Sequence, residues 1–288
     1  MSYLKVARDI KNLKIQGATN VALSALKSLK NLSPSDFKKA SKLFFNLRAT
    51  EPLLRNGLKY VSFKVDDGFS VDEAVFSFEK MINDSFEKTV EVGVRKIKRN
   101  SIVMTHCHSS VVVEIIKRAF DRGKVEKVFS SETRPLFQGR ITAKQLAGYG
   151  VPVVSYVDSA MRYFVNDADL VLVGADAITS DGFLVNKIGT SLLALAADEA
   201  RTSFGSAFEI FKFDPSTIEG YNERIEQRNK KEVWNTRIKN VEVVNPSFDF
   251  TPHDYVDFVI TNKGVFSIEN VPNLIEKNYG WLFNDFKY

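Results

Sequence analysis

Apolar positions recur at helical spacing through the first hundred residues. Leu4, Ala7 and Ile10 stand three residues apart, and Gly17 then interrupts the pattern. Similar spacing predicts a second helix that includes Leu29 and further helices over 36–47 and 70–97, with Pro52 marking the end of the helix that precedes it. These patterns predict an all-helical N-terminal domain over residues 1–98.

Beyond residue 100 the pattern changes to short, continuous apolar runs. The runs that predict strands lie at 102–104, 127–129, 151–156, 170–173, 207–211, 241–244 and 258–260. Helical segments separate the first of these runs, near 109–122, 142–148, 159–166 and 187–202. Apolar strands that alternate with helices are typical of a mostly parallel sheet covered on both faces. We therefore expect a Rossmann-like α/β domain over residues 99–288, and we expect it to carry the active site.

Two segments depart from this alternation. Residues 214–240 are polar and charged, so we interpret them as an excursion on the surface. The aromatic residues near the C-terminus are too apolar for a free tail, and we expect them to pack on the protein's own core or on another subunit. They are Tyr279, Trp281, Phe283, Phe286 and Tyr288.

The composition narrows the class of protein. The chain has 288 residues and a net charge of +5, with Lys and Arg spread along it, which disfavours a nucleic-acid binder and suits a polyanionic small substrate. Cys107 is the single cysteine, so neither an internal disulfide nor a Cys-only zinc site can form. No apolar run approaches the ~20 residues of a membrane span, so we expect a cytoplasmic protein without a membrane partner.

Polar residues follow the predicted strands, and ligands bind at the carboxyl ends of strands in open parallel sheets. Cys107 follows the first strand and precedes a helix, whose N-terminal amides would lower the pKa of the thiol. The alternative is an inert, buried cysteine. His106 and His108 would face away from Cys107 in extended backbone, so we expect no metal site here.

A carboxylate and several cations follow the other strands. Asp176 comes just after the apolar run 170–173, where poor solvation would raise its pKa enough for it to act as an acid. Lys187 opens a predicted helix and Lys212 follows the fifth strand; either could contact phosphate or be an ordinary solvated side chain. Arg134 and Arg140 suit phosphate binding, or an Arg–Glu pair in a capped loop. The sequence motifs of dinucleotide, P-loop and zincin sites are absent.

These strand-end segments resemble one known family. It contains ribose-1,5-bisphosphate isomerases, methylthioribose-1-phosphate isomerases and the alpha, beta and delta regulatory subunits of initiation factor 2B. The matching segments, in the family's order, are THCHS (105–109), ETRPLFQGR (132–140), VDSA (157–160), VGADAI (173–178), NKIGTS (186–191) and FKFDP (211–215). The segment 132–140 looks most like that of the archaeal ribose-1,5-bisphosphate isomerases. Gln16 and His108 stand where the family usually has Arg and Asn.

The resemblance implies an aldose–ketose isomerase that acts on ribose 1,5-bisphosphate through Cys107 and Asp176. The regulatory subunits usually lack that pair, so the pair favours an enzyme, while Gln16 and His108 slightly favour a non-catalytic regulatory subunit of translation initiation. A methylthioribose-1-phosphate isomerase is the other alternative. The residues that the resemblance assigns to the sugar and its phosphates are Gly17, Ala18, Arg48, Glu132, Thr133, Arg134, Gln138, Gly139, Arg140, Asn186, Lys187 and Lys212.

The family also sets expectations for cofactors and partners. Its isomerases work on a phosphorylated pentose and need no cofactor. Its members form dimers or larger assemblies, which implies a homodimer or higher homo-oligomer. A nucleotide effector such as AMP is compatible with the resemblance.

Overall fold

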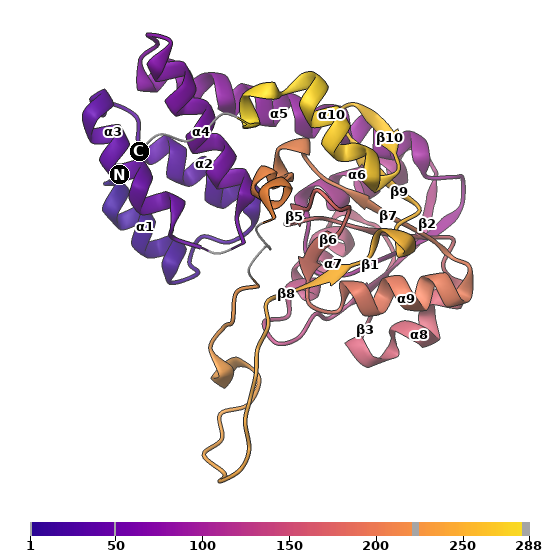
Figure 1. Ribbon diagram of the computed structural model, residues 1–288. Helices are drawn as coiled ribbons and strands as arrows, with labels where there is room; N and C mark the ends of the chain where they lie inside the picture. The colour runs from indigo at the N-terminus through magenta and orange to yellow at the C-terminus, as the bar shows by residue number, and fades with distance from the viewer. Residues whose placement is uncertain (1, 49, 221–224, 284–288) are drawn as a thin grey trace.

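The computed structural model describes residues 2–48, 50–220 and 225–283. Five helices come first, and strands and helices alternate after them (Figure 1). The first part comprises α1 (Tyr3–Lys11), α2 (Ala18–Ser28), α3 (Pro34–Phe45), α4 (Pro52–Asp66) and α5 (Val71–Lys96). The helical N-terminal region predicted by the sequence is therefore confirmed.

A seven-stranded sheet forms the centre of the second part. Its strands are β1 (Ser101–Thr105), β2 (Val125–Ser131), β3 (Val153–Tyr156), β4 (Leu170–Val173), β7 (Ser203–Ala207), β9 (Phe258–Thr261) and β10 (Gly264–Phe266). They lie in the order β10-β9-β7-β4-β1-β2-β3, and every pair is parallel except β10 with β9. The mostly parallel α/β fold is as the sequence predicted.

Helices cover both faces of this sheet, as alternate residues of one central strand demonstrate. Leu170 and Leu172 of β4 belong to the core that contains α6 and the end of α5. Val171 and Val173 belong to the core that contains α9 and the N-terminal helices. A strand that is apolar at every position is what two buried faces require. The helices of this part are α6 (Ser110–Asp121), α7 (Gln138–Tyr149), α8 (Met161–Phe164), α9 (Thr190–Ala200) and α10 (Val271–Asn278).

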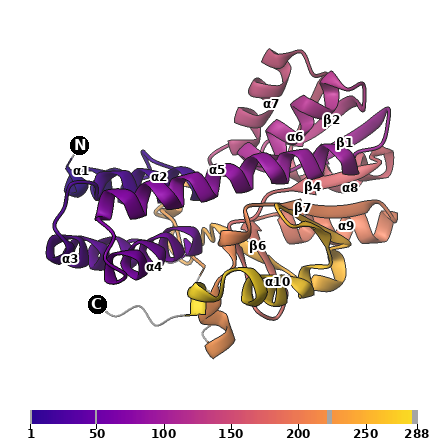
Figure 2. The same ribbon diagram turned by 90° about the horizontal axis from the view of Figure 1, so that it is seen from above.

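The long helix α5 joins the two parts. Figure 2 shows it running from beside α2 to beside α6. Its Phe78 packs on Tyr60 of α4, whereas Val90 and Val94 pack in the core beneath α6. At Gly93 a Cβ would lie 2.4 Å from Ile115 of α6, so glycine allows the two helices to approach. A domain boundary after residue 98 stays our proposal, because the larger core contains residues from both parts.

A small antiparallel sheet lies beside the large one, and a long excursion leaves it. Its strands are β5 (Ala177–Ile178), β6 (Leu184–Lys187) and β8 (Phe248–Thr251), in the order β5-β6-β8. Residues 225–247, here called the arm, extend away from the body (Figure 1). The predicted excursion over 214–240 is thus correct for its described residues from 225 onward, whereas Asp214 and Pro215 are buried in the body.

Three predictions of local structure in and before the sheets are wrong. Pro52 begins α4 instead of ending a helix, because a proline in the first turn lacks only an N–H that would have no helical partner.

The strand predicted at 207–211 lies earlier, at Ser203–Ala207. Its middle residue is Gly205, where a Cβ would lie 2.3 Å from the Phe258 ring, so this strand lacks a continuous apolar run. The run 241–244 lies in the arm and forms no strand.

The helix predicted over 187–202 begins only at Thr190. Asn186 and Lys187 therefore lie at the end of strand β6 and not at a helix start. Among the described helices, none combines the length and the apolar character that crossing a membrane requires.

Two of the C-terminal aromatic residues pack on the protein's own core, as predicted. The Trp281 ring lies 5.0 Å from that of Tyr60 and 6.2 Å from that of Phe78, and Tyr279 lies 4.9 Å from Phe211. Phe283 is 38% exposed, and Phe286 and Tyr288 lie outside the described residues. The C-terminal segment therefore links α4 and α5 to the loop after β7.

We predict that Trp281→Ala lowers the free energy of unfolding by about 2–4 kcal/mol, because it removes a ring packed on three other aromatic rings. Urea denaturation followed by circular dichroism measures the change. Trp234→Ala is the matched control, since Trp234 is 53% exposed on the arm and should change stability by less than about 0.5 kcal/mol. Equal losses in the two variants would contradict the packing role.

Candidate active site

A pocket of about 520 Å³ opens at the carboxyl ends of the central strands. The loops after β1 and β4 line it from the sheet, residues 14–20 with Arg48 and Glu51 line it from the N-terminal helices, and Arg228 lines it from the arm. This is the position in which open parallel sheets bind ligands. Its charged lining comprises the cations Lys14, Arg48, Lys187, Lys212 and Arg228 and the carboxylates Glu51 and Asp176.

Two hydrogen bonds fix helix α4 of the N-terminal part to the loop after β7, which carries Lys212. The buried Asn56 of α4 donates at 2.8 Å to the carbonyl oxygens of both Phe211 and Phe213. These carbonyls flank Lys212, and Arg55 of the same helix pairs with Asp214 at 2.9 Å. The loop that carries Lys212 is therefore fixed to the N-terminal helices.

Cys107 sits in a strained backbone conformation that its neighbours impose. Its φ is +67°, in the left-handed region that residues other than glycine rarely adopt. Its N–H donates to the Thr133 hydroxyl at 2.9 Å, and its carbonyl accepts from the Thr142 hydroxyl at 2.8 Å. Strain of this kind costs about 1–3 kcal/mol and is common at functional sites. The extended backbone expected around Cys107 is therefore wrong.

The expected lowering of the Cys107 pKa is also wrong. Desolvation by the surrounding protein raises the pKa of the thiol to about 11, and the charge of Asp176 adds to this, while Lys187 opposes it. The first turn of α6 lies farther along the chain, beginning at Ser110 after the N-cap Ser109. Desolvation therefore dominates the pKa of this side chain, and Cys107 is a thiol at neutral pH.

His106 supports the loop that carries Cys107. Its Nε2 lies 2.8 Å from the Ile188 carbonyl and its Nδ1 lies 2.6 Å from the Ser131 hydroxyl. A carbonyl can only accept, so Nε2 carries the proton and the ring connects β2 to the loop before α9. Within the described residues no three His, Cys, Asp or Glu side chains are grouped closely enough to hold a metal ion.

Asp176 meets the expectation of a raised pKa. It follows β4, and its side chain is only partly exposed. Desolvation raises the pKa of its carboxyl, and the charges of Lys212, Lys187 and Arg48 only partly offset this effect. A carboxyl in this environment can hold a proton and deliver it.

Three cations near Asp176 are buried and held in place. Lys212 pairs with the fully buried Glu209 at 3.1 Å, and Glu209 also accepts from Thr19 of α2. Lys187 lies over the Phe248 ring, 4.9 Å from its centroid. Arg48 contacts Glu51 at 2.9 Å, and it contacts Glu226 at the base of the arm at 2.7 Å. Fixed, desolvated cations of this kind are suited to binding phosphate.

The structure places nine of the residues predicted for the site along this pocket. They are Gly17, Ala18, Arg48, Cys107, Gln138, Asp176, Asn186, Lys187 and Lys212. The lining also contains residues that the sequence patterns did not single out, namely Lys14, Glu51, Arg228 and Phe248. Glu51 had a weak signal, since it lies three residues after Arg48, which the resemblance assigns to the site, whereas nothing in the sequence distinguished Arg228.

The remaining predicted residues lie outside the pocket lining, which does not include Glu132, Thr133, Arg134, Gly139 or Arg140. Arg140 pairs with Glu132 at 2.7 Å, which is the capped-loop alternative, and Arg134 donates to a carbonyl of the arm. At Gly139 a Cβ would lie 1.7 Å from the Ser131 carbonyl oxygen, so this glycine allows close packing of α7 on β2. The Thr133 hydroxyl accepts a hydrogen bond from the Cys107 N–H, so Thr133 contributes to the site by holding that backbone.

The profile of the initiation factor 2 subunit family matches residues 5–268. This chain belongs to the initiation factor 2 subunit family. It is 37% identical to a ribose 1,5-bisphosphate isomerase of Pyrococcus furiosus, over 97% of this chain and 94% of that protein. It is 40% identical to the protein of the same name from Methanocaldococcus jannaschii, over 95% and 94%. The crystal structure titled translation initiation factor eIF-2B from Pyrococcus horikoshii OT3 superposes with a TM-score of 0.81 at 28% identity, over 92% of this chain and 96% of that one.

In this member of the initiation factor 2 subunit family, Glu51 adds a second titratable carboxyl to the pocket. It is 3% exposed, and its Oε2 has no hydrogen-bond partner among the described residues. Desolvation raises its pKa to about 7, although Arg48 opposes the shift. Glu51 therefore changes its charge near neutral pH, beside the arginine that pairs with it.

We predict a pH dependence of stability from Glu51. Its ordinary pKa is 4.5 and its pKa in the folded protein is about 7, so the folded state binds more protons between these values and loses stability as the pH rises through them. Glu51→Gln should flatten the fall in unfolding free energy between about pH 4.5 and pH 7 by roughly 1–3 kcal/mol. Urea denaturation at several pH values measures this slope.

Glu126→Gln is the control, because the Glu126 side chain is 55% exposed. Its slope should equal that of the wild type. An unchanged slope in Glu51→Gln would show that Glu51 is ionised throughout this range.

Proposed function

We propose that this protein is an aldose–ketose isomerase that converts ribose 1,5-bisphosphate to ribulose 1,5-bisphosphate without a cofactor. One observation carries the proposal: Cys107 and Asp176 line the same poorly solvated pocket, whose charged lining is mostly cationic. Five lining cations face two carboxylates, which suits a substrate with two phosphates. The names of the relatives from P. furiosus and M. jannaschii support the same reaction.

The first step is opening of the sugar ring. The anomeric phosphate prevents the spontaneous opening that a free sugar undergoes, so an acid must protonate the ring oxygen. Asp176 is suited to this step because desolvation raises the pKa of its carboxyl, which favours the protonated form. As the proton moves to the ring oxygen, the bond between that oxygen and C1 breaks.

The second step moves hydrogen from C2 to C1. Cys107, as a thiolate, takes the proton from C2, which leaves an enol between C1 and C2. The Cys107 thiol then returns the proton to C1, and the Asp176 carboxylate left by the first step takes the proton of the C2 hydroxyl, which gives the ketose. Lys187 favours the thiolate, whereas an ionised Asp176 disfavours it. Cys107 therefore loses its own proton most easily before ring opening, while Asp176 still holds its proton. A direct hydride shift from C2 to C1 is the alternative route.

The other lining residues hold the substrate. Lys187, Lys212 and Arg48 supply positive charge near Asp176, and the polar side chains of Gln138 and Asn186 are available to the sugar hydroxyls. The backbone at Gly17 and Ala18 lines the side formed by the N-terminal helices. The loop beside Cys107 is shaped by residues outside the pocket lining, and we assign these a supporting role: Glu132, Thr133, Arg134, Gly139 and Arg140.

We also propose a cytoplasmic homodimer or larger homo-oligomer with no nucleic-acid or membrane partner. Exposed apolar side chains on α8, α9 and the loop before them support an interface, among them Tyr163 at 75%, Leu192 at 57% and Val157 at 53% exposure. A nucleotide effector such as AMP remains a prediction.

We predict that the wild type converts ribose 1,5-bisphosphate, and that Cys107→Ser and Asp176→Asn each lower kcat by at least about 100-fold, the range of general acid and base groups. Both variants should keep the wild-type circular dichroism spectrum. Coupling the product to a ribulose bisphosphate carboxylase assay measures the rate. Asp181→Asn is the matched control, since Asp181 lies outside the pocket lining.

A wild type that is inactive on ribose 1,5-bisphosphate would overturn the proposal. Activity on methylthioribose 1-phosphate instead would identify the other isomerase. Inactivity on both sugars, together with binding of an initiation-factor subunit, would favour a regulatory role, which the structural similarity to the P. horikoshii protein titled eIF-2B allows.

A further inference from the structure

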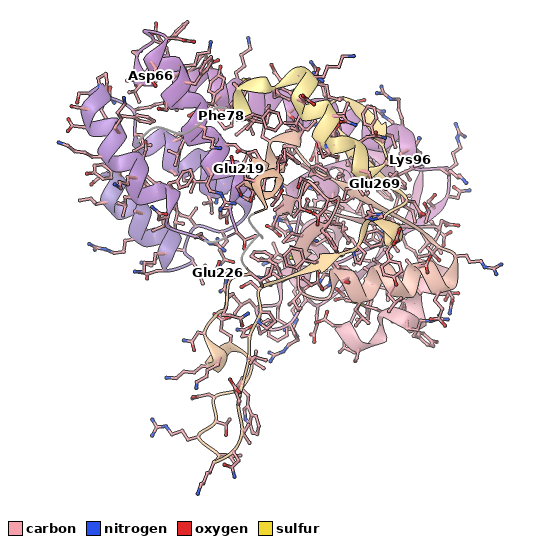
Figure 3. All side chains as sticks on the ribbon, in the orientation of Figure 1. Asp66, Phe78, Lys96, Glu219, Glu226 and Glu269 are labelled. Carbon is pink, nitrogen blue, oxygen red and sulfur yellow. The ribbon has the colours of Figure 1, made fainter. Side chains whose placement is uncertain are left out.

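The base of the arm brings charged side chains to the pocket. Arg228 donates its backbone N–H to the Asn245 carbonyl at 2.9 Å, and Ser247 donates to the Glu226 carbonyl at 3.0 Å, so the two ends of the arm pair as antiparallel segments. Residues two apart in an extended segment share a face. Glu226 contacts Arg48, and Arg228 lines the pocket, so this face is turned toward the pocket. Figure 3 shows Glu226 where the arm leaves the body.

The guanidinium of Arg228 is held rigidly. Its side chain is 6% exposed, and Glu232 accepts from its Nε and its Nη2, each at 3.2 Å. Asn245 in turn donates to Glu232 at 3.0 Å. The third nitrogen, Nη1, makes no hydrogen bond to any residue that the structure describes. An arginine fixed along one edge by a carboxylate presents its remaining donors to a ligand without a further loss of side-chain entropy.

The pocket wall formed by residues 14–20 supplies a second cation. Lys14 lines the same pocket, and its 3.8 Å contact with Asp9 leaves the side chain 72% exposed. Gln16 and Asn20 add uncharged polar groups to this wall. The cations that act most strongly on Asp176 are Lys212, Lys187 and Arg48. Arg228 and Lys14 thus provide positive charge in addition to the set around the reacting pair.

We propose that Arg228, assisted by Lys14, binds the substrate phosphate that lies farther from the reacting carbons, and so selects a bisphosphorylated pentose over a monophosphorylated one. This inference rests on the proposed function, since it assigns the second phosphate of the same substrate. A second phosphate needs donors beyond the cations beside Asp176. The fixed guanidinium on the arm meets that requirement and also explains why the arm base is held against the pocket.

The rival explanation is that Arg228 serves only to brace the arm through Glu232. The two roles predict different substrate dependence. A brace, when removed, would disturb binding of every ligand in the pocket alike. A phosphate-binding residue, when removed, would weaken only ligands that carry the second phosphate.

Binding is measured by calorimetry in the Cys107→Ser background, which prevents turnover, with ribose 1,5-bisphosphate and with ribose 1-phosphate. Arg228→Gln should weaken binding of the bisphosphate about 10- to 100-fold, as expected for lost hydrogen bonds to a charged group, and binding of the monophosphate by less than about 3-fold. Arg237→Gln, a substitution on the exposed part of the same arm, should change neither.

A rescue variant distinguishes loss of the positive charge of Arg228 from loss of its contact with Glu232, which supports the arm. Gln16 lines the same pocket beside Lys14, so Gln16→Arg combined with Arg228→Gln should recover at least part of the lost affinity for the bisphosphate if a cation is what the site needs. Equal weakening of both sugars, or no weakening of either, would overturn the inference. If the wild type binds both sugars and Arg228→Gln weakens only the bisphosphate, but no isomerase activity is found, the phosphate subsite stands and the proposed reaction fails.

Discussion

The two hydrogen bonds from Asn56 to the carbonyls of Phe211 and Phe213 are the contact on which the site depends. They fix α4 to the loop after β7 and so close the N-terminal helices over the carboxyl ends of the strands. Each is a buried bond, so loss of the amide would remove from both carbonyls the side-chain donor that the described residues supply. The raised pKa of Asp176 and the burial of Lys212 both follow from this closure, because neither residue would be desolvated on an open sheet edge.

The closed pocket combines desolvation with excess positive charge, and these two conditions suit different parts of one substrate. Desolvation favours the protonated forms of Asp176 and Cys107, the groups that would act on the carbon skeleton. The buried lysines and Arg48 act on phosphate, whose charge does not depend on those protons. Glu51 and Glu226 pair with Arg48, so a substrate phosphate would compete with these carboxylates for the guanidinium.

Much of the fold and the centre of the site were predictable from the sequence, for a definite reason. β1 and β4 are continuous apolar runs, and parallel strands must end at a common edge, so Cys107 and Asp176 could be placed together from the order of elements alone. The position of β7 was not predicted, because Gly205 in its middle interrupts the apolar run that a central strand usually has. Glu51 and Arg228 reach the pocket from a helix start and from the arm, and no local pattern predicts such long-range contacts. Arg134 and Arg140 lie outside the pocket lining, and Arg140 is held by its pair with Glu132 and by the Phe137 ring, contacts that no local pattern distinguishes from phosphate binding.

A crystal structure of the Cys107→Ser variant with ribose 1,5-bisphosphate bound would show whether Cys107 and Asp176 act on one sugar. We expect the ring oxygen within hydrogen-bonding distance of the Asp176 carboxyl and C2 beside the side chain of residue 107. A sugar that contacts only one of these two residues, or that binds outside the pocket beneath α4, would contradict this expectation.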